Sequence, residues 1–260
     1  MPGSSATQTL HQLRVLIVDD NDVNREFLRA GLTTMVDHIE VAADGQEAVE
    51  LCRERRFDVV LMDLHMPRMD GLSAFHRIRQ PGLASQAARI IMLTADARPD
   101  ERARMLEHGV DEYLNKPISI PQLTRALLDQ FNPGNADQSE LPDEDMATRL
   151  IVPEQSRAVA NGDEELAARM SLLFGQELER KLPDLDGMIQ RGEFHQAAAL
   201  LHQWRGASGF AGAARLHQAC GRLHKRLLAD EDRAAGTAYV EFLRVAHATC
   251  QALLTRPAQA

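Results

Sequence analysis

The chain has 260 residues, enough for two domains that each bury a core, and its formal net charge of −9 gives no support to nucleic-acid binding, which requires a basic surface. No apolar run approaches the roughly 18 residues of a membrane span, so we expect no membrane insertion. The cysteines, Cys52, Cys220 and Cys250, lack C-x-x-C spacing, and we expect reduced thiols in a cytoplasmic protein.

Strand and helix patterns alternate through the first half of the chain. The expected strands cover residues 15–19, 38–43, 58–63, 89–94 and 112–114, and the expected helices cover 22–34, 45–55, 72–79, 99–108 and 119–131. This alternation over about 120 residues predicts an α/β fold, a doubly wound parallel sheet with right-handed crossovers. The strand order should be the flavodoxin-like 2-1-3-4-5, whose switch point lies between strands 1 and 3.

Acidic residues follow two of the most apolar strands. Asp19 and Asp20 come at the end of the first strand, and Asp63 ends the third. Because strands 1 and 3 meet at the switch point, these three carboxylates should converge at one edge of the sheet. Such a cluster requires a cation, and oxygen-only ligands on loops favour Mg²⁺.

A hydroxyl and an ammonium group follow the last two strands, as Thr94 and Lys116. Beside a carboxylate pocket, they predict a phosphoryl group on Asp63, which would attack phosphorus and form an acyl phosphate. Mg²⁺ and Lys116 would neutralise the phosphoryl oxygens, and Thr94 would bond one of them. A metal-dependent hydrolase is a remote alternative, because Thr94 and Lys116 match a phosphoryl clamp.

Together these residues resemble the motifs of a response-regulator receiver domain, over residues 13–132. The motifs are Asp19-Asp20, Asp63 within Met62-Asp63-Leu64-His65-Met66-Pro67-Arg68-Met69-Asp70-Gly71, Thr94-Ala95 and Lys116-Pro117. The resemblance implies that Asp63 is the phosphoacceptor.

The same resemblance implies a metal site and a switch. Mg²⁺ would bind Asp20, Asp63 and the backbone carbonyl of His65, with Asp19 assisting directly or through water. Tyr113 matches the switch aromatic that turns inward as Thr94 moves toward the phosphoryl group. Alternatively, Tyr113 is an ordinary aromatic residue of an edge strand.

A polar stretch separates the two halves. We expect residues 1–12 to form a flexible tail and 133–148 to form a solvated linker, although its acids could instead cap a short helix. Helical patterns follow at 164–190, 193–209, 213–229 and 233–255. Short loops between them predict an all-α domain, an up-down four-helix bundle over 149–257.

The second of these helices carries the most informative histidine. Its buried stripe should contain Phe194, Ala197, Leu201, Trp204 and Ser208. His202 lies about 100° from Leu201 around the helix axis, so it should face the boundary or solvent. Arg205 and Gly206 lie one turn further on, and supply a cation and a small residue. An accessible neutral imidazole beside a cation suits in-line attack on a phosphoryl group.

The segment His202-Gln203-Trp204-Arg205-Gly206-Ala207-Ser208-Gly209-Phe210-Ala211-Gly212 resembles the signature of a histidine phosphotransfer (HPt) domain. The resemblance covers about residues 145–257 and implies that His202 carries a phosphoryl group, with Arg205 and Gly206 supporting the transfer. Trp204 stands where the family usually has leucine, and Arg205 where it has lysine. Arg205 keeps the positive charge.

These observations predict a two-component phosphorelay protein. Asp63 and His202 would exchange phosphoryl groups with a histidine kinase and with other receiver or phosphotransfer proteins. We see no kinase ATP-binding motif, so any activity would be self-catalysed aspartyl phosphorylation and His–Asp phosphotransfer. Two alternatives remain open: a helical domain that serves only interaction or dimerisation, with His202 inert, or a phosphate sink or phosphatase for another regulator. A phosphorylation-dependent dimer also remains open.

Overall fold

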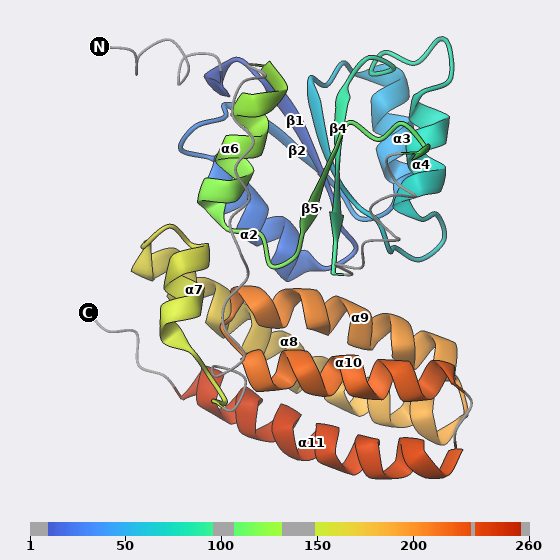
Figure 1. Cartoon of the computed structure of the whole chain (residues 1–260), viewed down its shortest axis with the longest axis vertical. Helices are drawn as coiled ribbons and strands as arrows, with labels where there is room; N and C mark the ends of the chain where they lie inside the picture. The colour runs from blue at the N-terminus through green and yellow to red at the C-terminus, as the bar shows by residue number, and fades with distance from the viewer. Residues whose placement is uncertain (1–9, 96–106, 132–148, 230–231, 256–260) are drawn as a thin grey trace. The chain divides into compact units, whose positions relative to one another are not determined.

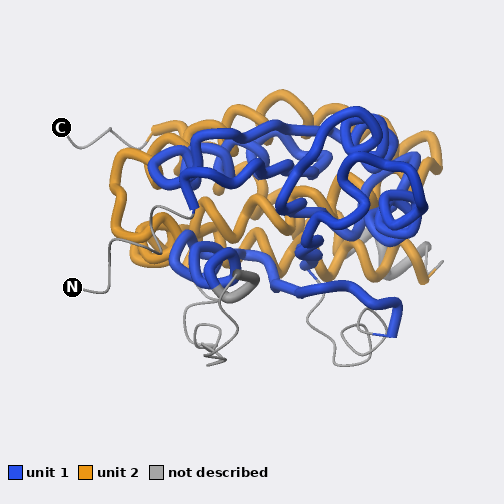
Figure 2. The backbone as a smooth tube through the Cα atoms, turned by 90° about the horizontal axis from the view of Figure 1, so that it is seen from above, with its two compact units in different colours: residues 1–137 blue, residues 138–260 orange. Residues whose placement is uncertain are grey.

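The computed structural model describes residues 10–95, 107–131, 149–229 and 232–255. The chain divides into two compact units, Met1–Asp137 and Gln138–Ala260, which have different colours in Figure 2. The expected linker at 133–148 lies outside the described residues, as does all of the expected helix 99–108 except its last two residues.

The first unit contains a five-stranded sheet whose neighbouring strands are all parallel. Its strands are β1 (Arg14–Val18), β2 (His38–Ala42), β3 (Val59–Asp63), β4 (Arg89–Thr94) and β5 (Glu112–Asn115). Their order is β2-β1-β3-β4-β5, which confirms the flavodoxin-like order expected from the sequence. The switch point therefore lies between β1 and β3.

Helices cover both faces of this sheet. In Figure 1, α3 (Gly45–Glu54) and α4 (Gly71–Ile78) lie on one face, and α2 (Asp22–Leu32) and α6 (Ile120–Phe131) lie on the other. Three of these helices have an N-cap residue whose side chain accepts a hydrogen bond from the backbone N–H of the residue three positions later. These caps are Asn21, Asp44 and Asp70. They satisfy N–H groups that have no partner within the helix.

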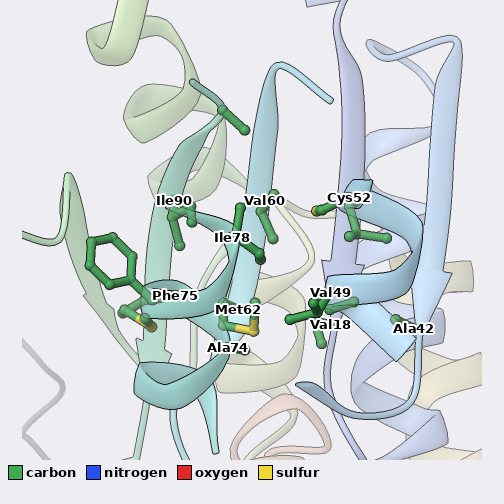
Figure 3. Close-up of a cluster of buried hydrophobic side chains, with 14 of the residues drawn as sticks. Val18, Ala42, Val49, Cys52, Val60, Met62, Ala74, Phe75, Ile78 and Ile90 are labelled. Carbon is green, nitrogen blue, oxygen red and sulfur yellow. The ribbon is translucent and has the colours of Figure 1, made fainter. Parts of the chain in front are cut away.

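The core explains why β3 is an unbroken apolar run. Figure 3 shows Val60 and Met62 of β3 among side chains from α3 and α4, including Cys52 and Phe75. Side chains alternate along a strand, so the other residues of β3 face the opposite side, and every residue of β3 is buried. Asp63 is the strand's one polar residue, and it stands at the end where a site can form.

The second unit is helical. Its elements are α7 (Pro153–Val159), α8 (Glu164–Gln190), α9 (Phe194–Phe210), α10 (Ala214–Leu228) and α11 (Asp232–Leu254). Helix α9 packs against α8 and α10, and α11 packs against the same two helices. The four long helices therefore form the expected bundle, with bounds within one residue of those expected. Asp163 caps α8 by accepting a hydrogen bond from the Leu166 backbone N–H.

The buried stripe of α9 is nearly as predicted. Ala197, Leu201, Trp204 and Ser208 are buried, and the Trp204 ring stacks on Phe242 with centroids 6.2 Å apart and planes at 6°. The prediction that Phe194 is buried was wrong, because this residue is only half-buried. As the first residue of α9, it lies at the end of the bundle, where fewer neighbours cover it.

Candidate functional site

Three carboxylates meet at the carboxyl ends of β1 and β3. Val18 of β1 pairs with Met62 of β3, so the residues that follow them are neighbours. One carboxylate oxygen from each of Asp19, Asp20 and Asp63 lies within 4.8 Å of the other two. Asp19 and Asp63 are buried, and Asp20 is partly exposed. Strand pairing alone therefore assembles the acidic cluster.

Lys116 enters this cluster from the end of β5. Its Nζ lies 2.6 Å from Asp19 Oδ2 and 3.0 Å from Asp63 Oδ2, and its side chain is buried. The Lys116 backbone N–H donates to the Thr94 carbonyl at 2.6 Å, which ties β5 to the end of β4. Thr94 is itself buried. The structure thus brings the residues singled out at four strand ends to one edge of the sheet.

Asp19 and Asp63 differ in how their oxygens are satisfied. Asp19 accepts hydrogen bonds from the Asn21 backbone N–H at 2.9 Å and from Asn24 Nδ2 at 3.0 and 3.1 Å, besides its contact with Lys116. Asp63 Oδ1 is buried and has no hydrogen-bond partner among the described residues. An unpaired buried oxygen is costly and marks a position for a ligand or ion.

Asn24 is a residue that our sequence analysis missed. It fixes the orientation of Asp19 from the first turns of α2. The signal was a polar residue three positions after the cap Asn21, on the face of α2 that turns toward the sheet.

The charges in the pocket oppose one another. Burial raises the pKa of Asp63 to about 7; Lys116 opposes this rise, and the carboxylates of Asp19 and Asp20 add to it. Burial alone would lower the pKa of Lys116, but Asp19 and Asp63 more than offset that effect, so its pKa is raised. One ammonium group thus faces three carboxylates. The oxygen-only donors fit a divalent cation such as Mg²⁺, as does Asp63 Oδ1, which lacks a hydrogen-bond partner in the described part of the chain.

Gly71 lies against the backbone of Asp63 and Leu64, at the end of β3. The Gly71 N–H donates to the Leu64 carbonyl at 2.9 Å, and a Cβ on Gly71 would lie 2.2 Å from the Asp63 carbonyl oxygen. Glycine at this position lets α4 begin directly against the end of β3. His65 lies in this loop with an exposed side chain.

Tyr113 lies in β5, the strand that precedes Lys116. It is half-buried, pairs with Met92 of β4, and packs against the hydrophobic cluster formed with α3 and α4.

His202 lies on α9 and faces α10. The residue is half-buried, and its ring centroid is 5.9 Å from that of His224, with planes at 49°. Arg205 is half-buried one turn further along α9, and its Nε donates to His217 Nε2 of α10 at 3.4 Å. Gly206 is buried. The contact between His202 and His224 could not be predicted from the sequence, because it depends on the packing of α9 on α10.

The described residues contain one group of three or more metal-ligating side chains, the Asp19, Asp20 and Asp63 cluster. None of the described helices combines the length and apolar character needed to cross a membrane.

The chain matches two protein-family models. Residues 15–128 match the response regulator receiver domain, and residues 169–256 match the Hpt domain.

Curated relatives align with both halves. The chain is 29% identical over 230 residues to the signal transduction histidine-protein kinase BarA of Escherichia coli K12, an alignment that covers 83% of this chain and 24% of BarA. It is 31% identical over 216 residues to the sensor protein GacS of Pseudomonas syringae pv. syringae, covering 80% of this chain and 24% of GacS. The chain therefore spans about a quarter of the length of these relatives.

A solved structure resembles the first unit. The receiver domain of sensor histidine kinase PA1611 from Pseudomonas aeruginosa PAO1, solved with a magnesium ion in its active site cleft, is 34% identical with a TM-score of 0.42. The match covers 47% of this chain and 98% of that domain.

Proposed function

Because the chain is a response regulator receiver domain followed by an Hpt domain, related to the C-terminal regions of the BarA and GacS hybrid kinases, we propose that it carries phosphoryl groups on Asp63 and on His202. The chain is a phosphorelay module of a two-component signalling pathway. The observation that carries the assignment of Asp63 is its buried Oδ1, which has no hydrogen-bond partner among the described residues and stands beside two further carboxylates and Lys116.

Asp63 is the nucleophile of the first site. An Asp63 oxygen forms a bond to phosphorus while the bond between phosphorus and the donor breaks, which gives an acyl phosphate. Lys116 already lies 3.0 Å from Asp63 Oδ2, so its ammonium group is placed to stabilise charge on a phosphoryl oxygen. The Thr94 hydroxyl, at the end of the adjacent strand, bonds a second oxygen.

The acidic cluster is the metal site. Asp20, Asp63 and the backbone carbonyl of His65 would hold Mg²⁺, with Asp19 assisting directly or through water. Asp19 already accepts hydrogen bonds from Asn21 and Asn24, which favours the indirect role. When bound, Mg²⁺ supplies positive charge that offsets the repulsion between carboxylates and phosphoryl oxygens.

Phosphorylation changes the surface near β4 and β5. Thr94 moves toward the phosphoryl group, and Tyr113 turns inward to fill the space. This is a local charge event that biases an element with two arrangements. The half-buried position of Tyr113 against the hydrophobic cluster is compatible with both arrangements.

His202 is the nucleophile of the second site. A nitrogen of its neutral imidazole forms a bond to phosphorus in line while the bond between phosphorus and the donor breaks, and the Arg205 guanidinium meets the anionic oxygens. Gly206 keeps the next turn of α9 free of side-chain bulk. The half-buried ring, with Arg205 one helical turn further along α9, favours this role over a bundle that serves only interaction or dimerisation.

The partners follow from the chemistry. A histidine kinase or another phosphohistidine donates to Asp63, and receiver or phosphotransfer proteins exchange with His202. We place the receiver at residues 13–132, the linker at 133–148 and the bundle at 149–257.

The first experiment tests Asp63. Incubation with acetyl phosphate and Mg²⁺ should form an acyl phosphate on the full chain. Hydroxylamine should remove this label, because hydroxylamine cleaves acyl phosphates. Asp63→Ala should abolish the label, whereas Asp37→Ala, which removes an exposed carboxylate, should keep it. Equal labelling of Asp63→Ala and the unmodified chain would overturn the assignment.

The second experiment tests His202. Phosphoramidate, a small donor with a P–N bond, should add a label that is stable in base and labile in acid, as a phosphohistidine is. His202→Gln should lose it, and His195→Gln, which removes an exposed histidine of the same helix, should retain it. A base-stable label that persists in His202→Gln would show that another residue reacts.

A further inference from the structure

The hydrogen bonds of His217 fix which of its ring nitrogens carries the proton. His217 Nδ1 lies 2.8 Å from the backbone carbonyl oxygen of Arg205. A carbonyl oxygen can only accept, so Nδ1 is the protonated nitrogen. In the neutral ring Nε2 is then an acceptor, and the Arg205 Nε–H donates to it at 3.4 Å. His217 thus holds both the backbone and the guanidinium group of the same arginine.

The surroundings of His217 keep its ring neutral. Burial, followed by the nearby Arg205 charge, lowers the pKa of His217 to about 4. The Ser208 hydroxyl lies 3.4 Å from Nδ1 and donates to the same Arg205 carbonyl at 2.8 Å. Nε2 is therefore available as an acceptor near neutral pH.

The side chain of Arg205 lies against α10 at Gly221, a residue without a side chain. A Cβ at Gly221 would lie 3.7 Å from Arg205 Nε and 4.0 Å from Cζ, so the arginine packs against the backbone there. His217, Gly221 and His224 follow one another at spacings of four and three, and so share one face of α10. The His224 ring in turn lies beside that of His202. The Arg205 guanidinium is thus held on the face of α10 that also meets His202.

We propose that His217 is a positioning residue for phosphoryl transfer at His202: it fixes the Arg205 guanidinium between α9 and α10, where it meets the phosphoryl oxygens. This inference rests on the proposed function of His202 and Arg205. A free arginine side chain loses rotamer freedom when it binds an anion, and a guanidinium that is already held loses less.

The test measures how fast phosphoramidate labels His202 in the full chain that carries Asp63→Asn, so that His202 is the one proposed phosphoryl site left. Adding His217→Leu should slow labelling about tenfold, because a hydrogen bond to a charged group is lost. His217→Gln should stay within about threefold of the parent, since its amide can donate to the carbonyl and accept from Arg205 Nε.

A double-mutant cycle separates positioning from a general structural effect. In an Arg205→Ala background, His217→Leu should cause no further loss of rate, although it should still lower the thermal midpoint of the bundle. Multiplicative rate losses, or an equal loss in His217→Gln and His217→Leu, would overturn the inference while leaving His202 as the phosphoryl site. Absence of base-stable label in the parent would overturn the proposed function of His202, and this inference with it.

Discussion

Asp19 and Asp63 both follow apolar strands and both lie buried in the same pocket, yet they are suited to different tasks. Asp19 is held by Asn21, Asn24 and Lys116, whereas Asp63 keeps one oxygen without a hydrogen-bond partner among the described residues. A fully bonded carboxylate is a rigid support, and a partly bonded one can still bind a metal ion or attack phosphorus. The difference arises from Asn21 and Asn24, which bond the Asp19 carboxylate.

His217 leads to a prediction about stability and pH. Its pKa is about 4 in the folded chain, below the ordinary value of 6.5, so the unfolded chain binds more protons between these values. The stabilisation from the neutral ring should therefore be complete above pH 6.5 and should disappear as the pH falls toward 4. The loss should be about 3 kcal/mol, at about 1.4 kcal/mol for each pKa unit.

Urea unfolding followed by the fluorescence of Trp204 measures this loss. His217→Gln should show a weaker fall between pH 6.5 and 4 than the unmodified chain, whereas His195→Gln, at an exposed position, should show the same fall. Parallel pH profiles for the unmodified chain and His217→Gln would contradict the prediction.

At this scale, residue types at strand ends were predictable and their partners were not. Asp19, Asp20, Asp63, Thr94 and Lys116 could be placed together because parallel strands bring their carboxyl ends to one edge. The support from Asn24 depends on the rotation of α2 against the sheet. The contact of Arg205 with His217 depends on the packing of α9 on α10, which spacing within one helix does not specify.

At the scale of elements, the fold followed closely from sequence periodicity. The bounds of the described strands agree with expectation to within one residue, because buried parallel strands are short apolar runs that end at polar residues. Helix α8 also agrees, because Asp163 caps its beginning and Arg191-Gly192 follows its end. The prediction of Phe194 as a core residue was wrong, because sequence periodicity does not show where a helix extends beyond the bundle core.

Gly71 tests how β3 and α4 are joined. Gly71→Ala should destabilise the receiver by about 1–3 kcal/mol, because its Cβ would lie 2.2 Å from the Asp63 carbonyl oxygen and backbone would have to shift. It should also slow acetyl phosphate labelling of Asp63. Ser73→Ala, an exposed change in the same helix, should leave both unfolding and labelling near the unmodified values. Unchanged stability of Gly71→Ala in urea unfolding would contradict this account of the join.

Trp204 tests the core of the bundle. Trp204→Ala should lower the free energy of unfolding of the bundle by about 3–5 kcal/mol, because a fully buried ring that stacks on Phe242 is lost. Trp204→Phe should cost much less, since the buried indole N–H has no hydrogen-bond partner in the described structure and its removal relieves that cost. Urea unfolding followed by circular dichroism measures both variants. Equal destabilisation by the two changes would contradict the proposed packing.

At the scale of the whole molecule, two units with separate cores contain the two proposed phosphoryl sites, Asp63 and His202. The receiver core lies between the parallel sheet and its helices, and the bundle core lies among α8 to α11. The cluster of Asp19, Asp20 and Asp63 belongs to the first unit, and the chain's single tryptophan belongs to the second. Each unit can therefore be followed separately in the intact chain.

Magnesium should stabilise one unit selectively. At about ten times the dissociation constant, Mg²⁺ should add about 1.4 kcal/mol to the stability of the receiver. Thermal unfolding by circular dichroism should show this rise, whereas the Trp204 fluorescence transition should not move. Asp63→Asn should remove most of the shift. An equal shift in the fluorescence transition would contradict a metal site confined to the receiver.

The central claim is that Asp63 and His202 both carry phosphoryl groups, and site mapping in the intact chain tests it most directly. The chain and its Asp63→Asn and His202→Gln variants are incubated with phosphoramidate and Mg²⁺, and the labels are sorted by their stability in acid, base and hydroxylamine. We predict a hydroxylamine-sensitive label that disappears only in Asp63→Asn and a base-stable label that disappears only in His202→Gln. A label of either kind that survives the loss of its assigned residue would contradict the account.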